Sequence, residues 1–559
     1  MKKRVKKIIG WGLFTLLVMA VSSIFVADHL LPPASGRPST ALPLAEADTA
    51  LDRELVPLLA RHPGQTGAIL LPDGIDAYAA RAISARQAGR SLDLQYYIWH
   101  DDLTGRMLAN EAWEAAERGV RVRILLDDVG IGNMDATLLA MDSHENIELR
   151  VYNPFRNRTG VLRLLEMVQR AWGVNHRMHN KAWIGDGRVA VVGGRNIGVE
   201  YFSAAEEFNF HDLDIVLFGP AVAQASTIFD DFWNSEAAIP IAALNRKRPS
   251  TIREVLAQIH EEAESEEARK FLDAMDVSPS VRRYFSRELT PIWTEGVRVL
   301  SDPPIKWRGD DRENWLVDHL MDQITGAERA ALLISPYFVP GVDGARGLVD
   351  LAGRGVNVSV VTNSLAANDV VAVHGGYARY RRELLEAGVH LFETRSRAES
   401  QAASSVFGSS GASLHTKAVL IDGSRGFVGS FNLDPRSANL NTEMGVLFDD
   451  PALGPDHALP VQQIGPRLRI LRLKGPSNAY LTKEALEAEL PALTDAFLDL
   501  LSCLPRKPDI LHCHFADAAE LGLAARARFG IPVMYTPHSL ASDKLDCVQD
   551  DCRDRLRRE

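Results

Sequence analysis

Two short stretches of the chain place the same chemical groups at the same spacing. They read "MHNKAWIGDG" (residues 178–187) and "LHTKAVLIDG" (residues 414–423). The shared groups are His179, Lys181 and Asp186 in the first stretch, and His415, Lys417 and Asp422 in the second. On an extended strand, residues two apart point to the same face, so each stretch offers an imidazole and an ammonium group at one spot.

An asparagine follows each stretch at a matching position. "GGRN" ends at Asn196 and "GSFN" ends at Asn432, each directly after an apolar strand. We expect both carboxamides to return to the sheet edge that carries the histidines. Two such sets suit attack on a phosphodiester, which needs a nucleophile, charge neutralisation and an acid for the leaving alkoxide.

In that chemistry one imidazole attacks phosphorus and the other protonates the leaving oxygen. The lysines and asparagines would hold the non-bridging oxygens. The motifs contain no carboxylate cluster and no zinc-ligand set, so we expect a reaction without metal and without a cofactor. Asp186 and Asp422 each precede a glycine, and we interpret them as turn residues, although they belong to the motif.

The two stretches are parts of a duplicated unit. His179 and His415 are 236 positions apart, and so are Asn196 and Asn432. Within each copy a strand, an amphipathic helix and a Val-rich strand follow one another, which favours a largely parallel sheet covered by helices. The lysine motif then closes a hairpin at Asp-Gly. We predict an α/β fold with two pseudo-symmetric α/β/α halves that share one active site.

At these residues the chain resembles the phospholipase D superfamily, whose hallmark is a doubled His-x-Lys-x4-Asp motif followed by Gly-Ser-x-Asn. "LDLQYYIWHDDLTG" and "FNLDPRSANLNTEMG" resemble bacterial cardiolipin synthases of the C type, and the resemblance runs from about residue 63 to 450. It implies phosphatidyl transfer to an alcohol acceptor, in which one phosphatidylglycerol, together with a second phosphatidylglycerol or with phosphatidylethanolamine, gives cardiolipin. It also implies that Ser430 binds the substrate, whereas the first copy has Gly194 at that position.

Three acidic residues are candidates for orienting the histidines. Glu443 follows Asn432 by eleven positions and could hold His415 through the second ring nitrogen, or it could be an ordinary surface residue. Asp212 and Asp214 are the candidates for the same role in the first copy, and the sequence does not choose between them. We assign His179 as the nucleophile.

The N-terminus predicts a membrane location. Five cations precede twenty uncharged residues, 8–27, which are enough to span a bilayer at 1.5 Å per residue. We favour an uncleaved anchor over a cleaved signal peptide, in residues 1–30, followed by a linker at 31–47. The basic flank stays in the cytoplasm, so we expect the catalytic part on the periplasmic side of a bacterial inner membrane.

The remaining boundaries follow from the repeat. We place the first half at 48–245, a helical linker at 246–285 and the second half at 286–450. Residues 460–559 differ in character, and from about residue 463 they resemble part of the Rossmann-like N-terminal domain of sucrose-phosphate synthase-like glycosyltransferases, with His538 at an acceptor-side position. The fragment lacks a nucleotide-sugar domain, so no glycosyl transfer is expected. In "HCH", residues 512–514, strand alternation argues against a metal site.

Charge and cysteine content narrow the alternatives. A formal net charge of -11 argues against a general nucleic-acid binder. All four cysteines lie after residue 500, so no disulfide framework holds the earlier part together. The partners that we expect are a phospholipid membrane and its lipids. A hydrolytic phospholipase or nuclease, a glycosyltransferase if the tail is functional, and a non-catalytic scaffold remain alternatives.

Overall fold

The computed structural model describes two compact units, residues 1–457 and 458–559. The described segments are 36–45, 48–131, 134–155, 176–205, 209–244, 252–263, 265–277, 291–309, 312–368, 370–394 and 414–453, with shorter pieces at 11–12, at 15 and after 453, the longest being 461–465, 468–471, 507–514 and 516–536.

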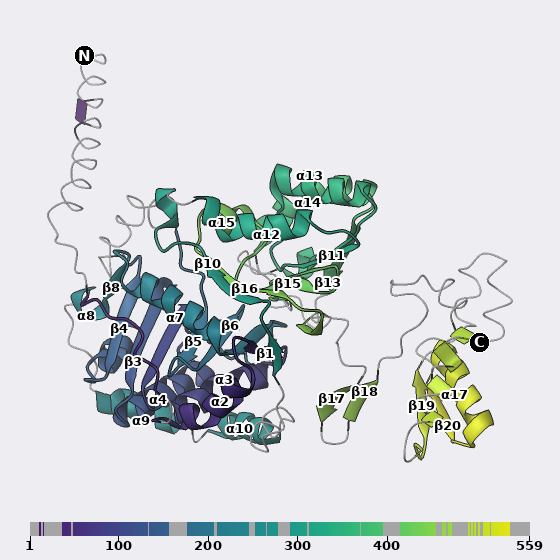
Figure 1. Ribbon diagram of the computed structural model, residues 1–559, viewed down its shortest axis with the longest axis horizontal. Helices are drawn as coiled ribbons and strands as arrows, with labels where there is room; N and C mark the ends of the chain where they lie inside the picture. Colours follow the sequence, from purple (N-terminus) through teal and green to yellow (C-terminus); the bar gives the residue numbers. More distant parts are fainter. Residues whose placement is uncertain are drawn as a thin grey trace, which may run out of the picture. The chain divides into compact units, whose positions relative to one another are not determined.

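The first unit contains two large sheets (Figure 1). One has nine strands in the order β8-β4-β3-β2-β5-β6-β7-β1-β9. In chain order its strands are β1 (Thr66–Leu71), β2 (Ser91–Ile98), β3 (Arg121–Gly130), β4 (Ile147–Tyr152), β5 (Ala182–Gly185), β6 (Val189–Gly193), β7 (Asp214–Phe218), β8 (Ala238–Pro240) and β9 (Ile292–Thr294).

The other sheet has seven strands in the order β10-β16-β15-β14-β11-β12-β13. They are β10 (Val297–Ser301), β11 (Ala330–Ile334), β12 (Asn357–Asn363), β13 (His390–Thr394), β14 (Ala418–Ile421), β15 (Arg425–Gly429) and β16 (Met444–Asp449). Residues 292–294 therefore complete the first sheet, and the chain crosses to the second sheet between β9 and β10.

The prediction of a largely parallel sheet is wrong. In the described part of the nine-stranded sheet only β2–β3 and β3–β4 pair in parallel. In the seven-stranded sheet only β11–β12 and β12–β13 do so. Each strand-helix-strand unit does give parallel pairs, but each lysine-motif hairpin then adds antiparallel neighbours, because strands joined by a tight turn must run in opposite directions.

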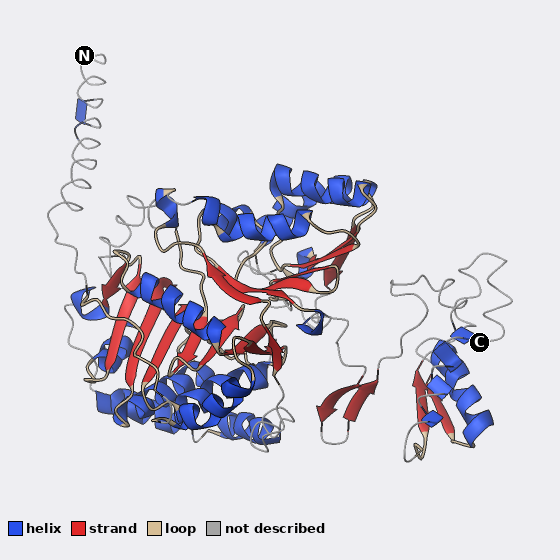
Figure 2. Ribbon diagram, in the orientation of Figure 1, coloured by secondary structure: helices blue, strands red, loops and turns tan. Residues whose placement is uncertain are grey.

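Helices cover the outer faces, and the inner faces of the two sheets meet (Figure 2). The helices of the first sheet are α2 (Ala50–Arg61), α3 (Gly74–Gln87), α4 (Leu103–Glu117), α5 (Asp135–Asp142), α7 (Pro220–Trp233), α8 (Ile241–Leu244), α9 (Ile252–Ala263) and α10 (Glu266–Val277). Those of the second are α12 (Leu316–Thr325), α13 (Gly341–Gly353), α14 (Val371–Glu386) and α15 (Pro435–Asn439). Short 3-10 turns lie at η1 (Lys306–Arg308), η2 (Arg312–Asn314), η3 (Leu365–Ala367) and η4 (Pro451–Leu453).

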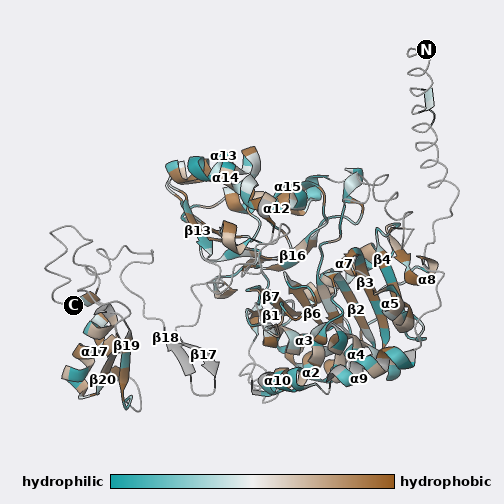
Figure 3. Cartoon of the chain, turned by 180° about the vertical axis from the view of Figure 1, so that it is seen from behind, coloured by the Kyte–Doolittle hydropathy of each residue, from teal (hydrophilic) through white to brown (hydrophobic). Residues whose placement is uncertain are grey.

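Strand β6 shows how the layers are built. Val189 and Val191 face the core beneath helices α3 and α4, whereas Ala190 and Val192 face a second core that contains α7 and residues of β15 and β16. In Figure 3 the helices outside the first sheet mix hydrophobic and hydrophilic residues, as amphipathic helices do. The predicted α/β/α halves are thus modified, because the inner face of the first sheet is shared between α7 and the second sheet.

The Asp-Gly hairpins form as predicted. β5–β6 and β14–β15 are antiparallel pairs, and both turn residues of each hairpin have positive φ: 53° and 66° at Asp186 and Gly187, and 54° and 80° at Asp422 and Gly423. The Asp186 carboxylate accepts hydrogen bonds from the N–H groups of residues 89–91. The Asp422 carboxylate does the same for residues 328–330. Both aspartates therefore tie the hairpin to the start of a neighbouring strand, which agrees with the turn interpretation.

The second unit contains two small sheets. β17 (Val461–Gly465) and β18 (Leu468–Leu471) form an antiparallel pair, and β19 (Leu511–His514), α17 (Ala516–Phe529) and β20 (Val533–Thr536) form a parallel βαβ unit. On β19, Cys513 is buried and His512 is exposed, so neighbouring side chains alternate as predicted. The Rossmann-like and glycosyltransferase assignments stay predictions, and His538 lies outside the described residues.

The first unit includes the predicted anchor and the predicted helical linker. Residues 1–10 and 16–35, which hold most of the predicted anchor, lie outside the described residues; among those described, no helix is long and apolar enough to cross a membrane. Within the predicted linker, α9 and α10 pack against α4 and α3 of the first half.

The structure predicts that the motif aspartates stabilise the fold. Replacing Asp186 by Ala leaves the N–H groups of residues 89–91 without their acceptor, and we expect a loss of roughly 2–4 kcal/mol in the free energy of unfolding, measured in urea. At temperatures where the variant is folded, its kcat should stay near the wild-type value. A large fall in kcat without loss of stability would contradict this role.

Asp422 allows a matched test by pH. Burial would raise the pKa of Asp422, but the N–H groups of residues 328–330 and the Arg425 guanidinium outweigh burial and lower it to about 2. Because this is below the usual value of about 3.9, the stabilisation is complete above about pH 4 and is lost as pH falls toward 2. The stability difference between wild type and Asp422→Asn should therefore be full at pH 6 and shrink below pH 4.

Candidate active site

The first motif histidine is held by the second half of the chain. The N–H of His179 donates to the carbonyl of Thr442 at 2.9 Å, beside a short parallel bridge between Met178 and Thr442. Nδ1 of His179 lies 2.8 Å from Oε2 of Glu443, the residue after Thr442, and 3.0 Å from the carbonyl oxygen of Ser430. A carboxylate at Nδ1 fixes the imidazole tautomer and leaves Nε2 as the reactive nitrogen.

The second motif histidine is held by the first half in the same way. The N–H of His415 donates to the carbonyl of His211 at 2.9 Å, beside a parallel bridge between His211 and Leu414. Nδ1 of His415 lies 2.5 Å from Oδ2 of Asp212, the residue after His211. Each imidazole therefore takes its carboxylate from the opposite half.

This exchange corrects the predicted orienting residues. We expected Glu443 to orient His415, but it pairs with His179. Asp212 was a candidate for orienting His179, but it pairs with His415. Asp214 does not contact either histidine; it forms buried ion pairs with Arg81 at 2.9 Å and Arg195 at 3.5 Å. The physical reason is the face-to-face packing of the sheets, which sets each motif against a loop of the other half.

The lysines complete one shared site. The ammonium groups of Lys181 and Lys417 each donate to the carbonyl of the histidine two positions earlier, at 2.6 Å in both cases. Nζ of Lys417 also lies 3.1 and 3.2 Å from Nδ1 and Nε2 of His415. The Gly429 N–H donates to the Lys417 carbonyl at 3.2 Å, and the carbonyl of the next residue, Ser430, lies 3.0 Å from Nδ1 of His179, so the two sets adjoin each other. Both lysines lie immediately before a strand, not within it as predicted.

The three predicted substrate-binding residues are placed differently from one another. Both ends of the Asn196 carboxamide are engaged, because Oδ1 accepts from the Ile98 N–H at 3.2 Å and Nδ2 donates to the Tyr201 hydroxyl at 3.0 Å. The Ser430 hydroxyl donates to Glu443 at 2.5 Å, so its single proton is used within the protein. Asn432 is buried, and its Oδ1 has no hydrogen-bond partner among the described residues. Asn432 therefore keeps a side-chain polar atom that no described residue uses, although a phosphate oxygen would need the donor Nδ2 and not the acceptor Oδ1.

Gly194 replaces the serine for a steric reason. A Cβ atom at this position would lie 2.3 Å from Oδ1 of Asp212. In the second half the corresponding Ser430 makes a hydrogen bond with Glu443. The shorter aspartate thus sits against a glycine and the longer glutamate against a serine.

The protonation states suit nucleophilic attack. Burial lowers the pKa of His179 to about 4 and also lowers that of His415, assisted by the neighbouring lysines. Burial would raise the pKa values of Glu443 and Asp212, but their histidine partners and nearby cations outweigh it, so both are lowered. Near neutral pH, neutral imidazoles therefore donate to ionised carboxylates. A phosphodiester anion would raise both histidine pKa values and favour a proton on one ring.

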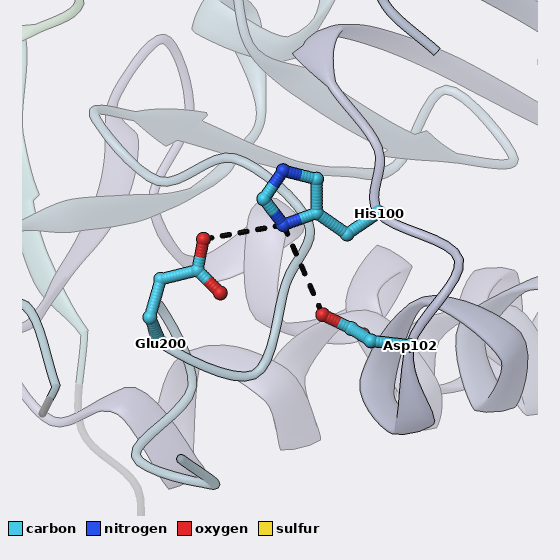
Figure 4. A group of neighbouring side chains, drawn as sticks. All are labelled: His100, Asp102 and Glu200. Carbon is cyan, nitrogen blue, oxygen red and sulfur yellow. Dashed lines mark ion pairs between the residues drawn. The ribbon is translucent and has the colours of Figure 1, made fainter. Parts of the chain in front are cut away.

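Among the described residues, one group brings three metal-ligand atoms within 4.8 Å of one another: His100, Asp102 and Glu200 (Figure 4). Nδ1 of His100 lies 3.2 Å from Glu200 and 3.9 Å from Asp102. The Asp102 carboxylate already caps α4 through the Gly105 N–H and accepts from the Val199 N–H, both at 2.9 Å. The group is explained as an ion pair and helix cap that hold the loop after Asn196 to the end of β2.

Comparison with known proteins agrees with this geometry. The family described as "Cardiolipin synthase, PLD-like domain" matches residues 83–233 and 320–458, which include both motifs. Cardiolipin synthase C of Escherichia coli (strain K12) is 41% identical over 406 residues, which are 71% of this chain and 85% of that protein. The chain belongs to the phospholipase D-like cardiolipin synthase family.

Two further similarities were found. An uncharacterized protein of Helicobacter pylori (strain J99 / ATCC 700824) is 34% identical over 398 residues, covering 70% of this chain and 78% of that protein. The crystal structure of phosphatidylserine synthase from Haemophilus influenzae Rd KW20 covers 69% of this chain and 82% of its own, at 13% identity and a TM-score of 0.48. The matched family segments end at residue 458, close to the boundary between the two units.

The sequence reasoning missed the aromatic walls of this cardiolipin synthase-like site. The Tyr97 ring meets His179 edge-on at 5.0 Å, and Tyr201 and Phe210 lie 5.2 and 5.0 Å from His415 between ring centroids. Alternation along β2, which buries Tyr96 in the core, could have indicated that Tyr97 points the other way.

The site predicts a decline in kcat/KM above neutral pH. Burial lowers the pKa of Lys181 to about 7, although Glu443 raises it. The ammonium group is charged below pH 7 and becomes neutral as pH rises, so binding of an anionic phosphodiester should weaken. We expect kcat/KM to fall by up to about tenfold per pH unit above this pKa. Glu443→Gln removes the charge that supports the ammonium form, and should move this limb to lower pH as well as lower kcat. A limb that moves to higher pH would contradict the assignment.

Proposed function

We propose that this chain transfers the phosphatidyl group of phosphatidylglycerol to the headgroup alcohol of a second phospholipid and so forms cardiolipin. Phosphatidylglycerol supplies the acceptor hydroxyl, because the headgroup of phosphatidylethanolamine carries an amine and no hydroxyl. Phosphatidylethanolamine would serve as an alternative donor that releases ethanolamine. One observation carries the proposal. Two buried imidazoles, each with a carboxylate on Nδ1, stand with two ammonium groups in one site.

In the first step Nε2 of His179 attacks phosphorus, a P–N bond forms, and the bond from phosphorus to the headgroup oxygen breaks. His415 gives its proton to the departing alkoxide, so glycerol leaves when phosphatidylglycerol is the donor. Burial lowers the pKa of His179 to about 4, so its ring is neutral at working pH, as a nucleophile requires.

In the second step His415, now neutral, takes the proton of the acceptor hydroxyl. The acceptor oxygen attacks phosphorus, the P–O bond forms, and the P–N bond to His179 breaks. The enzyme returns to its starting state, and atoms and protons balance over the two steps. In this proposal Lys181 and Lys417 neutralise the non-bridging oxygens throughout, and Nδ2 of the Asn432 carboxamide donates to one of them.

The predicted anchor at residues 8–27 belongs to this proposal. Holding the site on the periplasmic side of an inner membrane would give lipid alcohols a high effective concentration at the site, which favours transfer to lipid over hydrolysis. Residues 458–559 have no role in the proposed reaction, and their glycosyltransferase resemblance remains a prediction.

The test is to incubate the full chain with phosphatidylglycerol carrying a labelled phosphate, in membranes containing EDTA at fixed ionic strength. We expect labelled cardiolipin and free glycerol as the main products, because two ammonium groups supply the charge neutralisation. Quenching in alkaline denaturant, in which the P–N bond of a phosphohistidine is stable, should trap label on a peptide that contains His179. His179→Ala and His415→Ala should each lose nearly all turnover.

Three outcomes would count against the proposal. Predominant phosphatidic acid would make the protein a hydrolase. Activity that returns only with added metal would remove the metal-free mechanism. Label trapped on a peptide around His415 would mean that His415 is the nucleophile and that His179 is the acid and base.

A further inference from the structure

Both main-chain polar groups of Glu443 are fixed by one neighbouring residue. The Glu443 N–H donates to Oδ2 of Asp302 at 2.9 Å, and the Glu443 carbonyl accepts from the Asp302 N–H at 2.9 Å. The Ser301 hydroxyl also donates to this carbonyl, at 3.0 Å. The Glu443 carboxylate, which binds His179, therefore extends from a peptide segment that is bonded on both edges. On one edge the carbonyl of Thr442 accepts from the His179 N–H, and on the other edge Glu443 is bonded to Asp302.

A buried lysine holds Asp302 in turn. Lys306 is completely buried, and its three ammonium protons have three acceptors: Oδ2 of Asp302 at 2.8 Å, the Ser437 carbonyl at 2.8 Å and the Asn441 carbonyl at 3.0 Å. The other Asp302 oxygen accepts from the Leu316 N–H at 2.9 Å. Lys306 thus joins Asp302, which directly follows β10, to helix α15 and to the residues between α15 and Glu443.

Stability alone is a poor reason for this arrangement. Removing two charges from water costs as much as their attraction returns, so a buried ion pair in a hydrophobic core is often no better than apolar residues of the same size. What such a pair does fix is geometry. Here the geometry that it fixes is the main chain of the residue that orients His179.

The first half solves the same problem with different residues. The Arg195 guanidinium donates to the main-chain carbonyl of Asp212 at 2.5 Å, and Arg195 is itself paired with Asp214, which binds Arg81. All four side chains are buried. Each orienting carboxylate is thus backed by a buried cation that contacts neither histidine.

We propose that Lys306 and Asp302 are positioning residues for the reaction and act on His179 through Glu443. The inference rests on the proposed function in that His179 is the group whose reactivity they control. Neither residue touches the substrate; their contribution is the direction of the Glu443 carboxylate, and hence the tautomer and orientation of the imidazole.

The test is a double-mutant cycle with Lys306→Met and Glu443→Gln, read as total donor lipid consumed whatever the product. Lys306→Met alone should lower kcat by about 10–100-fold, as small displacements of catalytic groups do, with KM changed by less than about twofold. In the Glu443→Gln background the same change should lower kcat by less than about twofold, because the group that Lys306 positions is already disabled. Equal effects in both backgrounds would overturn the proposal.

Arg123→Met is the matched control. Arg123 is an equally buried cation, paired with Asp93 at 2.7 Å and Asp230 at 2.8 Å, and it contacts no residue of the site. The Arg123→Met variant should have a smaller free energy of unfolding in urea than wild type, and at temperatures where it is folded its kcat should equal that of wild type. A fall in kcat as large as that of Lys306→Met would show that any buried charge loss has this effect, and would also overturn the proposal.

Asp302→Asn covers the case in which Lys306→Met does not fold. It keeps the size of the side chain and weakens the anchor of the Glu443 N–H, so it should show the same background-dependent loss of kcat. If donor is consumed only to phosphatidic acid, the proposed transfer fails while this cycle still reads the role of Lys306. A kcat for Asp302→Asn equal to that of wild type would contradict the role directly.

Discussion

The site depends on pairing each buried imidazole with a carboxylate from the other half of the chain. His179 and His415 are both almost fully buried, and a charge that develops on either ring during reaction must be compensated inside the protein. Glu443 and Asp212 supply that compensation at 2.8 and 2.5 Å. Because neither half contains both members of a pair, one half alone would have no oriented histidine. The face-to-face packing of the two sheets is therefore a requirement of the chemistry as well as of the core.

The two halves meet this requirement with unequal parts. In the second half a glutamate bonds to Ser430 and is backed by Asp302 and Lys306. In the first, a shorter aspartate lies against Gly194. Its main-chain carbonyl is bound by Arg195. Duplication supplied two equivalent histidine motifs, and the surroundings of each now differ in size and charge. This asymmetry gives a physical basis for the different roles that we propose, with His179 as nucleophile and His415 as acid and base.

The local parts of this structure could be predicted from the sequence. The Asp-Gly hairpins, the strand-helix-strand units and the convergence of both motifs follow from short-range patterns and from the constant offset of 236 positions. The partners of the histidines could not be predicted in this way, because Asp212 and Glu443 are 231 positions apart and do not correspond under the repeat. Sheet direction beyond each unit, and the anchoring of Glu443 by Lys306, likewise depend on contacts between distant segments that periodicity does not encode.

The exchange of carboxylates between halves can be tested directly with protein whose histidines are labelled with ¹⁵N. The Nδ1–H signals of His179 and His415 are assigned by replacing each histidine in turn, and are then observed in Glu443→Gln and Asp212→Asn. The account predicts that Glu443→Gln alters the His179 signal and leaves His415 in place, and that Asp212→Asn does the reverse. If Glu443→Gln altered His415 and spared His179, each half would orient its own histidine and the shared site described above would be wrong.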